Sequence, residues 1–379
     1  MFDYETLKLI WWVLIGVLLI GFALTDGFDM GAMALMPFVG KTDNERRVAI
    51  NTIAPHWDGN QVWFITAGGA LFAAWPVVYA VAFSGLYWAM LAVLFALFCR
   101  PVGFDYRSKL ENQQWRTAWD WALFVGGAAP ALLFGVAFGN LFLGLPFRLD
   151  ALMRSTYEGS FFGLLHPFAL LAGVVSLSML SAHGGAWLMM RTDAALHARA
   201  RVATRLCSVV FMLAFAAAGL WLVLAIPGMS VADGIDLGGS INPLGKQVNA
   251  TNAGWMANYA HYPLTIGAPL LGFIGGFIAL LGAQTNSGVV AFVGSSLAII
   301  GTICTAGFAL FPFVFPSSID PASSLTVWDA VSSQKTLGIM FVVACIFVPL
   351  ILAYTLWCYT RMWGRLTDKT IEANPHGLY

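Results

Sequence analysis

Residues 8–36 read KLIWWVLIGVLLIGFALTDGFDMGAMALM, an apolar stretch long enough to cross a lipid bilayer. A membrane-spanning helix needs about 20 mostly apolar residues, because the hydrocarbon core is ~30 Å thick. Comparable runs recur to the end of the chain, which is 59% hydrophobic and only 10% charged. Soluble domains carry about 25% charged residues. The sequence therefore predicts an all-α polytopic membrane protein.

The apolar runs predict nine membrane-spanning helices. Ala74-Trp75-Pro76 separates the second span from the third by a tight reversal, since one helix across both would be far too long for the bilayer. We find no heptad, low-complexity tract or clear repeat, and expect a single integral-membrane domain over residues 1–379. The predicted spans cover residues 8–36, 56–75, 77–99, 118–143, 161–190, 203–227, 259–283, 287–314 and 336–361.

Basic residues predict the orientation of the chain. They gather in the loops 40–47, 100–116 and 191–205 and in the C-terminal tail. With nine spans all four segments lie on one face, which the positive-inside rule makes cytoplasmic. The N-terminus is then outside and the C-terminus inside, whereas eight spans would put one basic segment on the wrong side. Segment 228–258, rich in Gly, Asn and Asp, becomes the largest external loop.

Charge balance and cysteine positions argue against several classes of protein. Nineteen basic residues balance nineteen acidic ones, so no overall field indicates a nucleic-acid partner. No CxxC motif and no Cys/His pair at metal-binding spacing occurs, so neither a disulfide framework nor a zinc site is predicted. Each cysteine falls within or beside an apolar span: Cys99, Cys207, Cys304, Cys345 and Cys358.

Two carboxylates interrupt the first span, at Asp26 and Asp29. Residues three apart share one face of a helix, so both can reach the same cavity. A charged side chain at the bilayer centre costs about 2.5–3.5 kcal/mol on insertion scales, and such residues commonly have a functional role. The alternative is a structural pairing with a basic residue such as Arg100.

The stretch His56-Trp57-Asp58-Gly59-Asn60-Gln61-Val62-Trp63 begins the second span with polar and aromatic residues. Asp58 and Gln61 are three residues apart and His56 and Asn60 four, so two polar stripes can form on one helix. Carboxylate, amide and water in sequence would make a proton relay. The alternatives are a buried contact with another subunit, or a helix N-terminus at the headgroup level with Asp58 as a cap.

A third polar group follows the third span, with Arg100, Asp105, Arg107 and Lys109 at the cytoplasmic end. The simplest interpretation is a solvated basic loop with an Arg–Asp pair. Asp120, between two tryptophans, would line an entry path or act as an acid in the first turn of a helix.

The histidines give no haem site by themselves. His166 and His183 are far apart along one predicted helix, and no facing His or Met pair is evident. We expect both to be buried and hydrogen-bonded, and we expect this chain to hold no haem iron.

Together these segments resemble the second, smaller main subunit of the cytochrome bd-type quinol oxidases. The resemblance runs from Met1 to Tyr379 and is weakest in loop 228–258. His183 belongs to no family motif. The motifs that carry the resemblance are residues 25–31 (TDGFDMG), 56–63 (HWDGNQVW) within 51–74, 100–107 (RPVGFDYR), 311–313 (FPF) with 316–318 (PSS), and Trp328-Asp329.

The resemblance implies two four-helix bundles plus one peripheral helix, in a bacterial inner membrane. It implies a larger partner subunit that holds haem b, haem d and the quinol site, and a complex that oxidises quinol externally and reduces dioxygen to water. Protons for that reaction are drawn from the cytoplasm, which makes the enzyme electrogenic without a pump. The smaller subunit supports assembly, binds no haem, and can hold a structural quinone; small single-helix accessory subunits also occur.

Residue roles follow from the same resemblance. Asp58 and Asp26 would belong to a proton route toward the partner's haem d, and Trp63 would mark an oxygen entry. No catalytic or metal-binding residue is expected in this chain. The supporting polar positions would be Asp29, His56, Asn60, Gln61, Arg100, Asp105 and Asp120.

Two other classes fit part of the pattern. In a proton- or sodium-coupled secondary transporter, Asp26, Asp29 and Asp58 would bind a cation near the midplane, although no inverted repeat is evident. In a purely structural subunit, the carboxylates would only fix contacts with the larger chain. An Asp58→Asn variant separates a relay from a structural role, because only a relay predicts slow turnover in an assembled complex.

Overall fold

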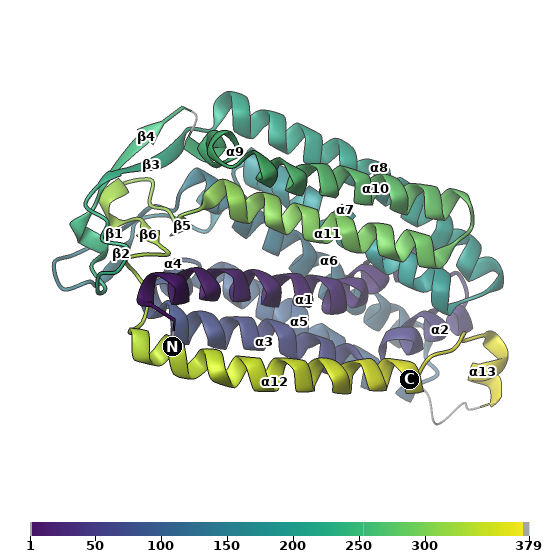
Figure 1. Cartoon of the computed structure of the whole chain (residues 1–379). Helices are drawn as coiled ribbons and strands as arrows, with labels where there is room; N and C mark the ends of the chain where they lie inside the picture. The colour runs from purple at the N-terminus through teal and green to yellow at the C-terminus, as the bar shows by residue number, and fades with distance from the viewer. Residues whose placement is uncertain (1, 253, 374–378) are drawn as a thin grey trace.

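The computed structural model describes residues 2–252, 254–373 and 379, and long helices lying side by side dominate it (Figure 1). Eight of the described helices are long and apolar enough to cross a membrane, so the chain is a multi-pass membrane protein. They are α1 (Tyr4–Val39), α5 (Tyr87–Tyr106), α6 (Gln113–Leu143), α7 (Pro167–Arg191), α8 (Ala194–Ala225), α10 (Gly267–Gln284), α11 (Gly288–Leu310) and α12 (Gln334–Arg361).

A further long helix, α3 (Trp57–Ala74), runs antiparallel to α1. Near its start Asn60 contacts Asp29, farther along Trp63 packs on Gly21, and at its end Ala74 shares a core cluster with Trp11. It is not among the eight apolar helices, because polar residues fill its first turn. Because α3 follows α1 for its whole length, it occupies the place of the second predicted span.

The third predicted span is displaced. α3 ends at Ala74, and Pro76 begins a separate short helix, α4 (Pro76–Gly85), at a position where the missing N–H costs nothing. The span itself is α5, so the predicted bounds 77–99 were wrong at both ends. The sequence could not show the break at Leu86, because α4 is as apolar as the spans beside it.

Short elements cap both ends of the bundle (Figure 1). The helices α2 (Asp43–Ile53) and α13 (Asp368–Ala373) lie at one end, and the strands gather at the other. The strands are β1 (Phe147–Leu149), β2 (Ser155–Tyr157), β3 (Gly228–Asp233), β4 (Gln247–Thr251), β5 (Phe313–Phe315) and β6 (Leu325–Thr326). The remaining helical turns are α9 (Ala257–His261), η1 (Arg107–Lys109), η2 (Phe162–Leu164), η3 (Pro243–Gly245), η4 (Gly254–Met256), η5 (Pro263–Ile266) and η6 (Pro321–Ser323).

Each pair of strands forms an antiparallel hairpin: β1 with β2, β3 with β4, and β5 with β6. Lys8 of α1 holds this end together, because its buried Nζ donates to the carbonyls of Leu237, Gly239 and Trp328 at 2.8–2.9 Å. Lys246 pairs with Asp329 at 2.8 Å. Burial lowers the pKa of Lys246, and the carboxylate of Asp329 opposes that change.

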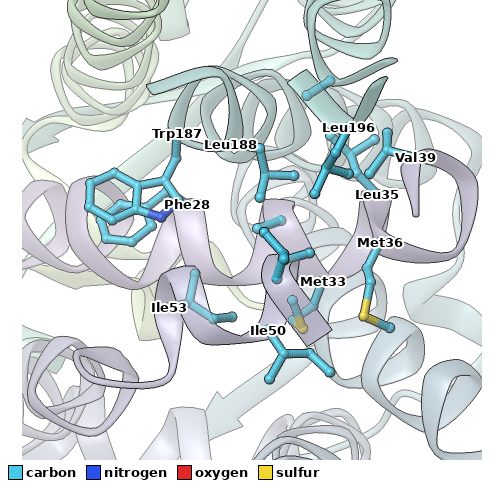
Figure 2. Packing of buried hydrophobic residues seen from close by; sticks show 14 of the residues in the cluster. Phe28, Met33, Leu35, Met36, Val39, Ile50, Ile53, Trp187, Leu188 and Leu196 are labelled. Atoms are coloured by element: carbon cyan, nitrogen blue, oxygen red, sulfur yellow. The ribbon is translucent and has the colours of Figure 1, made fainter. Parts of the chain in front are cut away.

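The centre of the bundle depends on glycine. A Cβ on Gly31 of α1 would lie 1.9 Å from the Leu180 carbonyl oxygen, and one on Gly184 of α7 would lie 2.2 Å from the Ala32 nitrogen. The two backbones therefore touch, as membrane helices do where small residues meet. Beside this crossing Phe28 stacks on Trp187 with centroids 4.1 Å apart, and Met33, Ile50 and Leu188 belong to the same buried cluster (Figure 2).

The crossing of α1 and α7 gives a direct test. Gly31→Ala should destabilise the folded protein by roughly 1–3 kcal/mol, because the added methyl group meets backbone atoms that cannot rotate away. The measurement is the thermal melting of the purified protein in detergent. Gly16→Ala, on the same helix with nothing within 4 Å of its Cβ position, is the matched control and should melt like the unmodified chain. Equal melting of both variants would contradict the packing argument.

Candidate functional site

Two carboxylates of α1 and a guanidinium of α5 form a buried ion pair. Arg100 donates from Nη1 to Asp26 Oδ2 at 2.9 Å and from Nη2 to Asp26 Oδ1 at 2.6 Å. Its Nη2 lies 3.7 Å from Asp29 Oδ2. The side chains of all three are at most 1% exposed. Pairing with Arg100, one of the two alternatives for Asp26 and Asp29, is therefore present, and the solvated loop predicted for Arg100 was wrong.

Helices α3 and α12 each contribute a polar side chain that is hydrogen-bonded to this ion pair, directly or through the other. Asn60 of α3 donates from Nδ2 to Asp29 Oδ2 at 2.8 Å, and the hydroxyl of Tyr359 on α12 donates to Asn60 Oδ1 at 2.6 Å. His56 stacks on the ring of Tyr359 with centroids 4.3 Å apart. We call Asp26, Asp29, Asn60, Arg100 and Tyr359 the buried polar cluster. Sequence reasoning missed Tyr359, because its partner lies 299 residues away and the apolar run around it gives no signal.

A second ionic network closes the end of the bundle that carries α2. Asp120 of α6 accepts from Arg46 at 2.6 Å and from Arg107 at 2.5 Å. Asp43 pairs with Arg107 at 2.9 Å and with Arg116 at 2.7 Å. Asp120 lies beyond the first turn of α6, so its interpretation as a first-turn acid was wrong. The network fixes the short helix α2 to η1, which directly follows α5, and to α6.

The start of α2 is fixed in addition by a capping box. Thr42 accepts from the backbone of Glu45, and the Glu45 carboxylate accepts from the backbone of Thr42. Burial alone would raise the pKa of Glu45, but hydrogen bonds from Arg199 and from the amides of Thr42 and Lys41 lower it overall. The carboxylate therefore stays ionised where it meets Arg199 of α8.

Several predicted residues lie outside the buried polar cluster. Asp58 stands in the first turn of α3 and is exposed, without acting as its cap, and Gln61 is half-buried. Asp105, near the end of α5, is also exposed. Trp63 is buried, with its indole against Gly21. The structure thus brings Asp26, Asp29, Asn60 and Arg100 together and leaves Asp58 on the outer surface of α3.

The imidazoles are already engaged with protein groups. His183 is fully buried, and its Nδ1 and Nε2 lie 2.8 Å from Ser295 Oγ and 3.0 Å from the Leu24 carbonyl oxygen. The prediction of a buried, hydrogen-bonded histidine is confirmed there. His166 is exposed instead and accepts from the backbone of Phe168 at the start of α7. Both ring nitrogens of His183 are therefore engaged, whereas Nε2 of His56 is buried with no hydrogen-bond partner among the described residues.

An apolar cavity of about 200 Å³ lies among α1, α3, α6, α7, α8 and α11. It is separate from the buried polar cluster, and none of its lining side chains is charged. Aromatic rings dominate its wall, including Phe22, Phe64, Phe134, Phe138, Phe168 and Phe215. Such a cavity suits a hydrocarbon chain or an apolar ring.

Comparison with known proteins identifies the family. The family model of cytochrome bd terminal oxidase subunit II matches residues 7–362. The chain belongs to this family. It is 53% identical over 379 residues to the cytochrome bd-I ubiquinol oxidase subunit 2 of Escherichia coli, with both chains fully covered. The probable cytochrome oxidase subunit 2 of Haemophilus influenzae is 52% identical over the same length.

More distant relatives agree. The cytochrome bd ubiquinol oxidase subunit 2 of Bacillus subtilis is 31% identical over 365 residues, which cover 95% of this chain and 97% of the relative. A chain from the solved structure of the bd oxidase of Geobacillus thermodenitrificans superposes with a TM-score of 0.68 and 14% identity, covering 95% of this chain and 100% of that chain. The structural likeness supports the fold, and the sequence matches favour an oxidase subunit over a transporter.

The ion pair of the buried polar cluster predicts a large effect of removing Arg100. Arg100→Gln should destabilise the protein by about 3–5 kcal/mol, because it leaves buried carboxylates without their cation. Melting of the purified complex, or its yield from membranes, measures this. Arg154→Gln, which removes the same charge from an exposed pair with Asp150, is the control and should leave both quantities nearly unchanged. A comparable effect at both positions would refute the assignment.

Proposed function

We propose that this chain is the haem-free subunit of a respiratory quinol oxidase that reduces dioxygen to water. In this proposal it supports assembly of the complex and gives protons access from the cytoplasm to the haem site of the larger subunit. The family match over residues 7–362 carries the proposal. The names of the relatives, which are ubiquinol oxidase subunits, support the substrate class.

The proposed topology has nine spans, with the N-terminus outside and the C-terminus inside a bacterial inner membrane. α1 begins and α12 ends at opposite ends of the bundle, as an odd number of crossings requires (Figure 1). Arg46, Arg107 and Arg116 meet in one network at the end that carries α2, which supports a cytoplasmic position for that end. We further propose one integral-membrane domain, built as two four-helix bundles and a peripheral helix, with 228–258 outside.

Haem b and haem d are proposed to lie in the larger subunit, where they supply the electron transfer and oxygen chemistry. The engaged nitrogens of His183 support this assignment, because they leave that imidazole no free lone pair for iron. The part played by this chain is then to hold and deliver protons and to pack against its partner. Small single-helix accessory subunits and surrounding lipid would complete the complex.

The outer face of α3 is the proposed contact with that larger subunit. Asp58, Val62, Ile65, Gly69 and Phe72 are exposed on α3 with alternating spacings of four and three residues, as in left-handed helix pairs. Nothing lies within 4 Å of a Cβ placed on Gly69. Small residues let membrane helices approach closely, whereas a carboxylate facing lipid is costly. A partner helix here would enclose Asp58.

Asp58 and Asp26 are the proposed members of the proton route. Asp58 faces the proposed partner, and Asp26 lies in the buried polar cluster beneath the same end of α3. Trp63, one helical turn from Asn60, is the proposed oxygen entry, supported by its position beside the apolar cavity wall at Phe64. The supporting polar positions remain Asp29, His56, Asn60, Gln61, Arg100, Asp105 and Asp120.

Replacing Asp58 tests the proton route. Asp58→Asn removes the titratable group but keeps the side-chain shape, so we expect an assembled complex whose quinol-dependent oxygen uptake falls at least about tenfold, or ~1.4 kcal/mol in barrier. The visible spectrum of the reduced complex reports whether assembly and haem content persist. Asp150→Asn, in the turn after β1, is the control and should keep full turnover. Normal turnover of Asp58→Asn would eliminate the relay.

The apolar cavity is the proposed site of the structural quinone. Its volume of about 200 Å³ and its aromatic wall support binding of a quinone ring or part of its prenyl chain. The ring would be held by stacking on phenylalanines and by exclusion of water, since the cavity offers few polar groups.

A cavity-filling substitution tests this site. Ala218→Phe places a ring in the cavity wall of α8, so the purified complex should lose most of its extractable quinone while keeping its haem spectrum. Solvent extraction followed by chromatography gives the ratio of quinone to haem. Ala217→Phe, on the adjacent exposed position, should leave that ratio unchanged. Equal quinone content in both variants would place the quinone elsewhere.

A further inference from the structure

The charges of the buried polar cluster do not balance. Asp26 and Asp29 carry two negative charges when ionised, and Arg100 carries one positive charge, which leaves one excess negative charge among side chains at most 1% exposed. Two carboxylates that share one buried site with a single cation do not both ionise readily, because burial removes the hydration of bulk solvent and the two negative charges repel each other. One of the two therefore has to hold a proton.

The hydrogen bonds distinguish the two carboxylates. Both oxygens of Asp26 accept from Arg100, at 2.6 and 2.9 Å, which is the bidentate geometry of an ionised carboxylate. Asp29 has only its Oδ2 engaged, by Asn60 at 2.8 Å and by the longer approach of Arg100 at 3.7 Å. Its Oδ1 is buried with no hydrogen-bond partner among the described residues. An ionised oxygen in that position would cost far more than a neutral one.

Among the described residues, no cation other than Arg100 lies within ion-pair distance of Asp29. Arg191 of α7 is engaged elsewhere, with its guanidinium between the indoles of Trp187 and Trp363 and its Nη2 on the Met362 carbonyl. His183 of α7 binds Ser295 and the Leu24 carbonyl. His56 stacks on Tyr359, which itself donates to Asn60.

We propose that Asp29 is the proton-holding residue of the cluster, protonated at Oδ1, and that Asn60 and Tyr359 are its positioning residues. Tyr359 donates to Asn60 Oδ1, which turns the amide nitrogen of Asn60 toward Asp29 and makes Asp29 Oδ2 the accepting, carbonyl-type oxygen. Asp26, by contrast, stays ionised as the partner of Arg100. Only the functional meaning of this proton, as a store on the proposed proton route, rests on the proposed function.

Infrared spectroscopy of the complete complex tests the proposal. The carbonyl stretch of a protonated carboxyl group, which shifts on exchange into heavy water, should be present in the unmodified complex and lost in Asp29→Asn. Asp29→Glu should retain such a band at a changed frequency. Asp26→Asn should lose it too, because Arg100 would then pair with Asp29 and ionise it. The haem spectrum of each preparation shows that it is assembled.

Retention of the band in Asp29→Asn would overturn the proposal, and so would its retention in an assembled Asp26→Asn complex. Because Asp29→Asn and Asp29→Glu are compared directly, the test does not depend on the folding of Asp26→Asn. Oxygen uptake by the assembled Asp58→Asn complex separates the two proposals. Full turnover of Asp58→Asn refutes the proton route, whereas only the infrared bands decide whether Asp29 holds a proton.

Discussion

A guanidinium buried beside two carboxylates is the constraint on which the arrangement of four helices depends. Arg100 can be buried only where Asp26 meets both of its terminal nitrogens, and this fixes the register of α5 against α1. Asp29 in turn requires Asn60 of α3, and Asn60 requires Tyr359 of α12. Each helix thus satisfies a polar group that another helix buries. Apolar surfaces alone would allow these helices to slide or rotate, and the polar contacts do not.

Much of the fold could be predicted from the sequence, because hydropathy over 20-residue windows reports directly on a ~30 Å membrane. The reversal at Pro76 was also predictable, since proline lacks an N–H. The identity of α4 as a separate helix was not, because helix breaks without proline or charge leave no trace in hydropathy. Nor did any sequence pattern indicate the backbone contact at Gly31 and Gly184, because that contact depends on how α1 and α7 pack against each other in three dimensions.

Most residues of the buried polar cluster could be predicted from the sequence, but which of them contact one another could not. Asp26, Asp29, Asn60 and Arg100 were recognisable because polar groups inside apolar runs are expensive. Asp58 has the same composition signal, yet the helix turns it to the other side of α3 from Asn60. A spacing of two residues changes direction by about 200° on a helix with 3.6 residues per turn, which is why neighbouring polar residues serve different surfaces. Tyr359 could not be predicted for a different reason. Its role depends on Asn60, a partner 299 residues away in the sequence.

The lysine that holds the strand-bearing end has a consequence for how the protein is made. Lys8 leaves the ribosome with the first helix, but the carbonyls that bind it lie 229 to 320 residues later in the chain. During most of synthesis its ammonium group must stay solvated at the membrane surface, which keeps the start of α1 from sinking into the lipid. The strand-bearing end can fold completely only after Trp328 has been synthesised. The same residue therefore anchors the first helix during insertion and later completes the strand-bearing end of the folded subunit.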